Sequence, residues 1–272
     1  MDEIRIPTKT LHFLASISPA QMFNLRLSPG EPLRMTTVDL GHVYMVDAMV
    51  PDAVFNVEEE KIVGLDCDEV RFFCENTPTS TVHLRLFDDR VLLMAGDVYR
   101  KNLSPPDRYN ILPSIHKPPR NLNISLVAYV GPKTFYEKVR AIRQRYDHAV
   151  LVTREGTLFI VGYDISTPQN YTHHVLSRSV VGRGAGAYPT EYLFDMAKHF
   201  LALSKLSLSP PPIGVYLGDT PAMSGWPLKA RMKTPAGLVL EEYLAPRIVD
   251  GDNADVFEKE VLPNLKPKPT WW

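Results

Sequence analysis

Residues 103–122, LSPPDRYNILPSIHKPPRNL, divide the chain into two halves that follow the same order of elements. The stretch contains five prolines. It shows neither the alternation of a strand nor the spacing of a helix. Proline fixes φ and donates no backbone hydrogen bond, so we expect an extended connector that crosses the surface. What repeats on its two sides therefore decides the fold.

The first half is predicted to begin with a helix over 8–17, because Leu11, Leu14 and Ile17 share one helical face. A second helix is predicted over 68–76, DEVRFFCEN. Alternating segments follow each helix and predict strands. These segments are MFNLRLS (22–28), LRMTTVD (33–39), VYMVDAMV (43–50), TVHLRLF (81–87), RVLLMAG (90–96) and VYRKNL (98–103). The order is helix, strands, helix, strands.

The second half repeats this order, with predicted helices over 133–146 and 190–204. The first of them carries an apolar stripe of Phe135, Val139, Ile142 and Tyr146. The predicted strands are AVLVTREG (149–156), TLFIVGYD (157–164), YTHHVLS (171–177), IGVYLG (213–218), PLKARMK (227–233) and LVLEEYLAP (238–246). The chain is therefore predicted to be an α+β protein built from two diverged copies of one helix and β-meander unit.

The charge is unevenly distributed. The formal net charge is −1, which by itself argues against a protein that binds nucleic acid. However, residues 1–103 hold 10 Lys and Arg against 16 Asp and Glu, whereas residues 122–249 hold 14 against 9. One half is acidic and the other basic, so a nucleic-acid surface is expected mainly in the second half.

Two motifs carry a family resemblance. DLGHVYMV (39–46) is similar to the DxSHVxLV segment in the first domain of PCNA-type DNA sliding clamps, and YLAPRI (243–248) is similar to the YLAP(K/R)I ending of those clamps. Pro227-Leu228 precedes this ending at the expected distance. The arginine in YLAPRI makes this ending more similar to that of the archaeal PCNA-type clamps. The resemblance implies a clamp domain over 1–103, a connecting loop over 104–121 and a second clamp domain over 122–249.

If the resemblance holds, three such subunits form a ring whose helices line the hole and whose sheets lie outside. The ring encircles duplex DNA without reading its sequence and tethers DNA polymerase, the clamp loader and nuclease- or ligase-type enzymes through short peptide motifs. No catalytic residue and no cofactor are expected. The candidate DNA-facing residues are Lys9, His12, Arg71, Lys133, Lys138, Arg140, Arg143, Arg145, Lys198 and Lys205. An ordinary solvated helix face is the alternative for those of the helix 133–146.

The resemblance also implies a partner pocket and a subunit interface. The pocket residues would be Val38, His42, Val43, Met45, Tyr109, Ile111, Leu112, Pro227, Tyr243, Ala245, Pro246 and Ile248. Subunits would pair edge to edge through Val98 and Tyr99 of one copy and Tyr171, His173 and Val175 of the next. As an alternative, Ile111 and Leu112 pin the connector to its own domain.

Other functions rest on weaker patterns. Gly182–Ala187, GRGAGA, imitates the start of a dinucleotide site, which would make the chain an enzyme. Pro189 interrupts the turn and no acidic residue follows at the required distance, so a flexible loop before the helix 190–204 is the preferred interpretation. A subunit of a mixed ring or of a damage-checkpoint clamp remains an alternative that sequence cannot separate from a homotrimer.

The remaining features predict no metal site and no membrane span. Cys67 and Cys74 have no CxxC or Cys/His spacing and are interpreted as small core residues. His173 and His174 are expected on opposite faces of a strand. We expect a cytoplasmic protein, or a nuclear one if the source is eukaryotic, because no long apolar stretch or signal peptide is present. The segment 250–272 is expected to be a disordered tail; either it is inert, or Trp271 and Trp272 reach the partner pocket.

Overall fold

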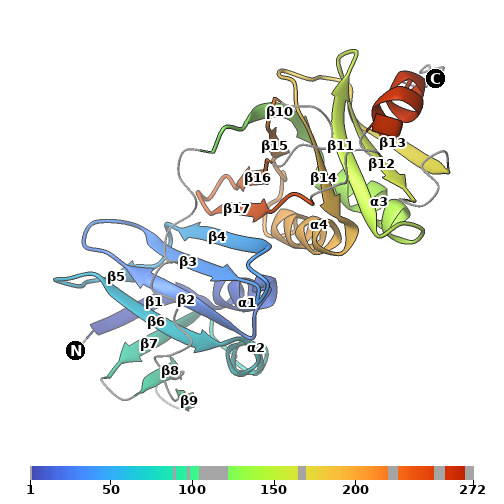
Figure 1. The fold of residues 1–272 in the computed structure, drawn as a ribbon. Coiled ribbons are helices and arrows are strands. Elements are labelled where there is room, and N and C mark those ends of the chain that lie inside the picture. Colours follow the sequence, from blue (N-terminus) through green and yellow to red (C-terminus); the bar gives the residue numbers. More distant parts are fainter. Residues whose placement is uncertain are drawn as a thin grey trace. The chain divides into compact units, whose positions relative to one another are not determined.

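The computed structural model describes residues 2–87, 90–96, 99–103, 122–164, 170–219, 226–247 and 255–266, with the backbone alone for 99–103 (Figure 1). The chain divides into two compact units. Unit 1 comprises Met1–Pro119 and Lys233–Glu241, and unit 2 comprises Arg120–Met232 and Glu242–Trp272.

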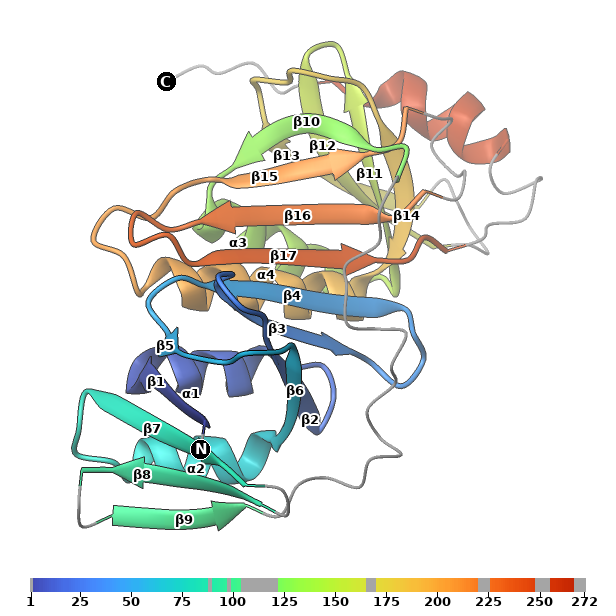
Figure 2. The same ribbon diagram turned by 90° about the vertical axis from the view of Figure 1, so that its left-hand side faces the viewer.

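Within the described residues, unit 1 contains two helices and its own strands. They are β1 (Asp2–Pro7), α1 (Thr8–Ile17), β2 (Met22–Leu27), β3 (Leu33–Val38), β4 (Tyr44–Val50), β5 (Val54–Phe55), β6 (Lys61–Asp66), α2 (Cys67–Glu75), β7 (Thr81–Leu86), β8 (Val91–Ala95) and β9 (Tyr99–Leu103). Antiparallel ladders join β4 to β3, β3 to β2 and β2 to β6. A second sheet has the order β5-β1-β7-β8-β9, and β9 lies at its edge (Figure 2).

Unit 2 repeats this arrangement. Its elements are β10 (Ser125–Val130), α3 (Pro132–Arg143), β11 (His148–Arg154), β12 (Thr157–Tyr163), β13 (Tyr171–Ser177), β14 (Ala185–Pro189), α4 (Thr190–Ser204), β15 (Ile213–Leu217), β16 (Leu228–Lys233), β17 (Val239–Leu244, which lies across the division), η3 (Phe257–Val261) and η4 (Leu262–Asn264). Here β12 pairs with β13 and β11, and β11 pairs with β14. The ladders β2–β3, β3–β4 and β2–β6 thus have counterparts in β11–β12, β12–β13 and β11–β14. The predicted duplication is confirmed in chain order and in strand pairing.

Local sequence explains the helices that the prediction located correctly. In α1, Leu11, Leu14 and Ile17 are buried as expected from their spacing. Helix α2 begins one residue earlier than predicted because the carboxylate of Asp66 caps it, accepting a hydrogen bond from the Glu69 backbone N–H at 2.9 Å. The buried Cys67 and Cys74 are free thiols, and burial raises the pKa of Cys67 to about 11 and that of Cys74 to about 12.

The structure corrects the expectation of a flexible loop at Gly182–Ala187. Residues Ala185–Pro189 form β14, which pairs with β11 from Val152 to His148. A glycine is required at position 186, since a Cβ there would collide with the Tyr188 hydroxyl oxygen. A dinucleotide site needs a helix beginning at such glycines, but α4 begins only at Thr190, after the strand.

The structure also departs from the expected disordered tail. Within 250–272, residues 255–266 are described, and they form the helical turns η3 and η4. Phe257, Val261 and Leu265 are each 0% exposed. The three side chains are buried because they recur every four residues on one face of the segment, which sequence reasoning overlooked.

None of the helices in the described part of the chain combines the length and apolar character that a bilayer crossing needs. The described residues likewise contain no cluster of three or more His, Cys, Asp or Glu side chains arranged to hold a metal ion.

Candidate nucleic-acid interface and partner surface

Helix α3 separates an apolar face from a basic one. Pro132 at its first turn follows Gly131, and Phe135, Val139 and Ile142 are buried at i, i+4 and i+7 spacing. The helix packs closely on its sheet, because a Cβ on Gly162 of β12 would lie 2.7 Å from Ile142. Of the predicted basic residues, Lys138 is half-buried and the others are exposed: Lys133, Arg140, Arg143 and Arg145.

The helix ends earlier than predicted. Arg143 is its last residue, so Arg145 and Tyr146 lie beyond it in a turn in which both backbone N–H groups donate to the Ile142 carbonyl oxygen at 3.0 Å. The hydroxyl of Thr190 donates to the Tyr146 carbonyl oxygen at 2.7 Å and thereby fixes the exit of the chain. Tyr146 is half-buried, and its hydroxyl lies 3.0 Å from the Thr172 hydroxyl of β13.

An aromatic pair lies between α3 and α4. The rings of Tyr136 and Phe194 are stacked with centroids 5.5 Å apart. The Arg143 guanidinium carbon lies 4.6 Å from the Phe194 centroid, and the Lys198 Nζ lies 5.2 Å from it. The ring therefore holds one cation from each helix above its face. Sequence reasoning identified both cations but missed the aromatic pair. The available signal was that Tyr136 and Phe194 are aromatic residues that do not belong to the buried side of α3 or α4.

Nearby carboxylates neutralise part of the positive charge on α3 and α4. Lys198 Nζ lies 2.6 Å from Asp195 and Lys133 Nζ lies 3.9 Å from Glu137. Lys205 is exposed and caps the end of α4. The surface of α3 and α4 stays positive in spite of these pairs, because few acidic residues lie near the remaining basic ones: Arg140, Arg143, Arg145 and Lys205.

The candidate residues of unit 1 are more fully neutralised. His12 Nε2 lies 3.2 Å from the Glu75 carboxylate, and Arg71 pairs with Asp68. Lys9 is exposed on α1. The helices of unit 1 therefore present a weaker positive surface than those of unit 2, in agreement with the uneven charge of the sequence.

The β3–β4 hairpin contains the unit 1 part of the predicted partner pocket. Oδ1 of Asp39 accepts hydrogen bonds from the backbone N–H groups of Val43 and Tyr44, both at 2.7 Å. Held in this turn, His42 has φ 56°. Val38, Val43 and Met45 are half-buried and His42 is exposed. The prediction omitted Leu40, which is 97% exposed at the tip of this turn.

The unit 2 part of the predicted pocket lies at the end of β17. Pro227, Ala245 and Pro246 are half-buried, and Tyr243 is buried with Lys229 Nζ 5.3 Å from its ring centroid. The Arg247 backbone N–H donates to the Ala187 carbonyl oxygen at 2.9 Å, which ties this end to β14. The predicted pocket residues Tyr109, Ile111, Leu112 and Ile248 lie outside the described residues.

The predicted subunit interface falls on two sheet-edge strands. Within the described residues, β9 ends the sheet of unit 1 and β13 ends the sheet β13-β12-β11-β14 of unit 2. Val98 lies outside the described residues, and Tyr99 begins β9. On β13, Tyr171 and Val175 pack against a cluster of buried apolar residues, and the His173 ring lies 5.9 Å from that of Phe159. Their side chains are thus engaged within the chain, while the backbone of β13 forms the edge.

The comparison with solved structures gives the fold. The PCNA of A. fulgidus, solved with the C-terminal region of FEN-1 bound, superposes with a TM-score of 0.70 at 17% identity, covering 92% of this chain and 100% of that one. The chain has the two-domain clamp fold of PCNA. The PCNA2–PCNA3 complex of Sulfolobus tokodaii gives a TM-score of 0.67 at 19% identity, covering 91% of this chain and 99% of that one.

A third solved structure has the same fold. The PCNA of Entamoeba histolytica gives a TM-score of 0.70 at 14% identity and covers 91% of this chain and 98% of that one. Comparisons with protein-family models and with curated proteins gave no match. The predicted PCNA-type fold is therefore confirmed by the similarity of the tertiary structures, at sequence identities of 14–19%.

Proposed function

We propose that the protein is a sliding clamp: a trimeric ring that encircles duplex DNA and tethers DNA polymerase, the clamp loader and other replication and repair enzymes. The observation that carries the proposal is the basic surface of α3 and α4, gathered around Phe194 in a chain with the PCNA fold. In this proposal residues 1–103 and 122–249 are the two clamp domains and 104–121 connects them. The protein is a scaffold without catalytic activity.

A ring explains how a nearly neutral chain binds DNA. An enclosed duplex cannot leave sideways, so weak phosphate contacts that carry no sequence information are sufficient. Only the helices that face the hole need to be basic. The Lys and Arg residues of α3 and α4 supply such contacts, whereas the acidic excess of residues 1–103 then belongs to surfaces that do not meet DNA.

Topological binding is tested by blocking DNA ends. The protein is allowed to thread onto linear duplex DNA, and both ends are then closed with streptavidin. We expect retention on the closed DNA and release when a restriction enzyme cuts it. Equal dissociation from open and closed DNA would contradict encirclement, because ordinary binding does not depend on the ends.

Assembly is proposed to pair β9 of one copy with β13 of the next. Both strands end their sheets within the described residues, and pairing would satisfy their outward backbone groups. Tyr99→Pro removes a donor from β9 and should yield folded monomers, as measured by sedimentation. Val54→Pro in β5, at the other end of the same sheet, is the control and should leave the oligomer intact. A trimer of unchanged mass in Tyr99→Pro would exclude this interface.

The partner surface is proposed at the β3–β4 hairpin, the end of β17 and the connector, and it would receive a short peptide with an aromatic plug. Support comes from exposed and half-buried apolar side chains found in each unit by itself, Leu40 and Met45 in unit 1 and Pro246 in unit 2. The A. fulgidus PCNA of the same fold was solved with a FEN-1 segment bound.

A mixed ring is the second candidate, favoured by the pairing of His12 with Glu75 and of Arg71 with Asp68 on the unit 1 helices. A homotrimer would present these weakly charged unit 1 helices three times, whereas different subunits could supply more positive charge on the surface that faces DNA. The S. tokodaii complex combines two different PCNA chains. Mass measurement of the protein alone and with sibling chains distinguishes the two: a trimer alone supports the homotrimer, and a trimer formed only with siblings supports the mixed ring.

A further inference from the structure

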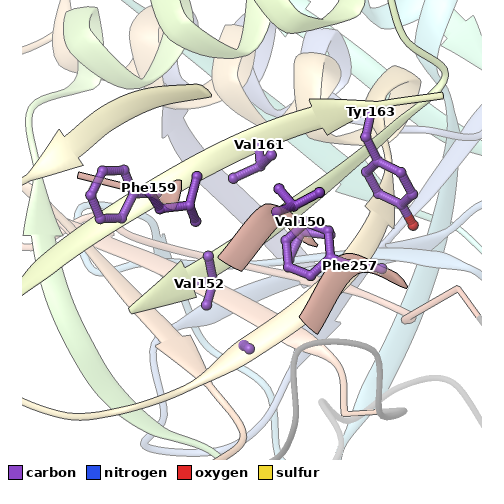
Figure 3. Packing of buried hydrophobic residues seen from close by; sticks show 10 residues of the cluster. Val150, Val152, Phe159, Val161, Tyr163 and Phe257 are labelled. Carbon is purple, nitrogen blue, oxygen red and sulfur yellow. The ribbon is translucent and has the colours of Figure 1, made fainter. Parts of the chain in front are cut away.

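Residues 255–265 cover one face of the sheet β13-β12-β11-β14. Figure 3 shows Phe257 among side chains of that sheet, including Val150 and Val161. The Phe257 and Tyr163 ring centroids are 5.6 Å apart. Val261 and Leu265 complete the buried side of the segment, and Leu262 packs partly against the same cluster. The outward side is polar, since Glu260 and Lys266 are exposed.

The covered face is apolar across neighbouring strands. Val150 of β11 pairs with Val161 of β12, and Val152 pairs with Phe159. On the other side of β11, the same two valines pair with Ala187 and Ala185 of β14. Cross-strand partners project to the same face, so these residues form one continuous apolar surface. All seven residues of β12 are buried, as expected for a strand covered on both faces.

On β2 and β3, the matching face of unit 1 carries polar and charged side chains. In the equivalent strands β2 and β3, Asn24 pairs with Thr36 and Arg26 pairs with Arg34. Arg26 Nε donates to Glu60 at 2.9 Å, and Arg34 forms an ion pair with Asp47 of β4 at 3.3 Å. By contrast, within the described residues the equivalent strands β11 and β12 carry valine and phenylalanine on this face, and residues 255–265 cover them.

The cover extends onto the edge strand. Tyr171 of β13 pairs with Tyr163, and Val175 pairs with Phe159, which places both side chains on the covered face. The opposite face of β13 is held by Leu176, which is 5% exposed, and by the hydrogen bond between the Thr172 and Tyr146 hydroxyls. On its remaining edge, β13 has no neighbouring strand within the described residues.

We propose that residues 255–265 act as a brace for β13 and that assembly of copies through β13 depends on this brace. The dependence on assembly rests on the proposed ring. An edge strand that is packed on both faces is already ordered before a second copy binds. The free energy of pairing is then not reduced by the entropic cost of ordering the strand. Without the brace, the cluster against which Tyr171 and Val175 pack loses Phe257, Val261 and Leu265, so the strand opens locally more often.

The experiment compares two full-length double variants. Phe257→Ser with Val261→Ser removes two of the three buried side chains of the brace, and Glu260→Ser with Lys266→Ser changes an exposed residue of the segment and the exposed residue that follows it. Amide hydrogen exchange is measured in β13, with β10 and β15 as internal references. For the first variant we expect exchange in β13 about tenfold faster and oligomer dissociation at about tenfold higher protein concentration. The control variant should match wild type in both measurements.

The outcomes separate the brace from the ring. Unchanged exchange in β13 would overturn the brace even if wild type is a trimer. Faster exchange with unchanged assembly would overturn the dependence on the brace. A wild type that stays monomeric alone and with sibling chains would overturn the proposed ring, while exchange would still test the brace. If β10 and β15 also exchange faster, the milder Val261→Ala variant replaces the double variant, and acceleration confined to β13 is then the required result.

Discussion

The guanidinium carbon of Arg143 lies 4.6 Å from the centroid of the Phe194 ring, which joins the last turn of α3 to α4. The same ring has Lys198 Nζ at 5.2 Å. Two cations that would otherwise repel each other are thus both attracted to the π electrons of one aromatic ring. Phe194 is a positioning residue in the proposed DNA interface: it orients charges rather than supplying one.

Phe194→Leu should weaken DNA retention without loss of fold. Leucine keeps the apolar contact but removes the ring face, a cation–π interaction of about 0.5–1 kcal/mol per exposed cation. We expect the half-life on end-blocked DNA to fall severalfold. Tyr216→Leu is the matched control, because Lys229 Nζ lies 5.4 Å from the Tyr216 ring outside α3 and α4. A half-life that falls equally in both variants, or in neither, would contradict the role of Phe194.

Charge reversal on α3 should act on DNA and not on assembly. Changing Lys138, Arg140, Arg143 and Arg145 to Glu turns the local potential negative, so DNA-stimulated clamp loading and polymerase processivity should fall and depend less on salt. Sedimentation should show an oligomer of unchanged mass, since none of the four residues lies on β9 or β13. Normal processivity in an intact ring would exclude α3 from the DNA-facing surface.

Peptide binding at the partner surface should weaken when either of two pocket side chains, distant in sequence, is shortened to alanine. Met45→Ala and Ile248→Ala are each expected to weaken binding of a Gln-x-x-apolar-x-x-aromatic-aromatic peptide by about 1–2 kcal/mol. Their double variant should be non-additive if both side chains contact the same plug. Leu208→Ala is the control, because Leu208 is fully exposed but belongs to no predicted pocket. Equal affinities in a titration of all five proteins would exclude the site.

Glu3 should make stability depend on acid pH. Hydrogen bonds from His83 and Arg85 lower the pKa of Glu3 from 4.5 to about 2. Its stabilising effect is therefore complete above pH 4.5 and is lost as the pH falls towards 2. Glu3→Gln should lower the Tm near pH 6 by a few degrees, for a loss of about 1 kcal/mol. This difference should shrink towards pH 2. A difference that is independent of pH, or one shared by Glu58→Gln at an exposed position, would contradict this assignment.

The sequence by itself determined the duplicated order of elements and the limits of several of them. Thr8–Ile17 and Thr190–Ser204 are helices at the predicted residues, because each has a periodic apolar face. The exposure of the basic residues of α3 could also be predicted, because the buried stripe of Phe135, Val139 and Ile142 leaves the charged side chains on the remaining surface of the helix. These features depend on neighbours within a few turns, which the sequence displays directly.

Only the tertiary structure decided the features that join distant segments. Gly186 and Ala187 have the composition of a loop, yet they form a strand because β11 supplies hydrogen bonds from about 35 positions earlier in the chain. The continuous apolar run of β12 indicated that both faces are covered, but it could not name Phe257 and Val261 as the cover. Likewise, no local pattern placed Phe194 beneath Arg143. Burial of an apolar surface is non-directional, so a sequence shows that a cover is needed while the packing of the whole unit selects which segment provides it.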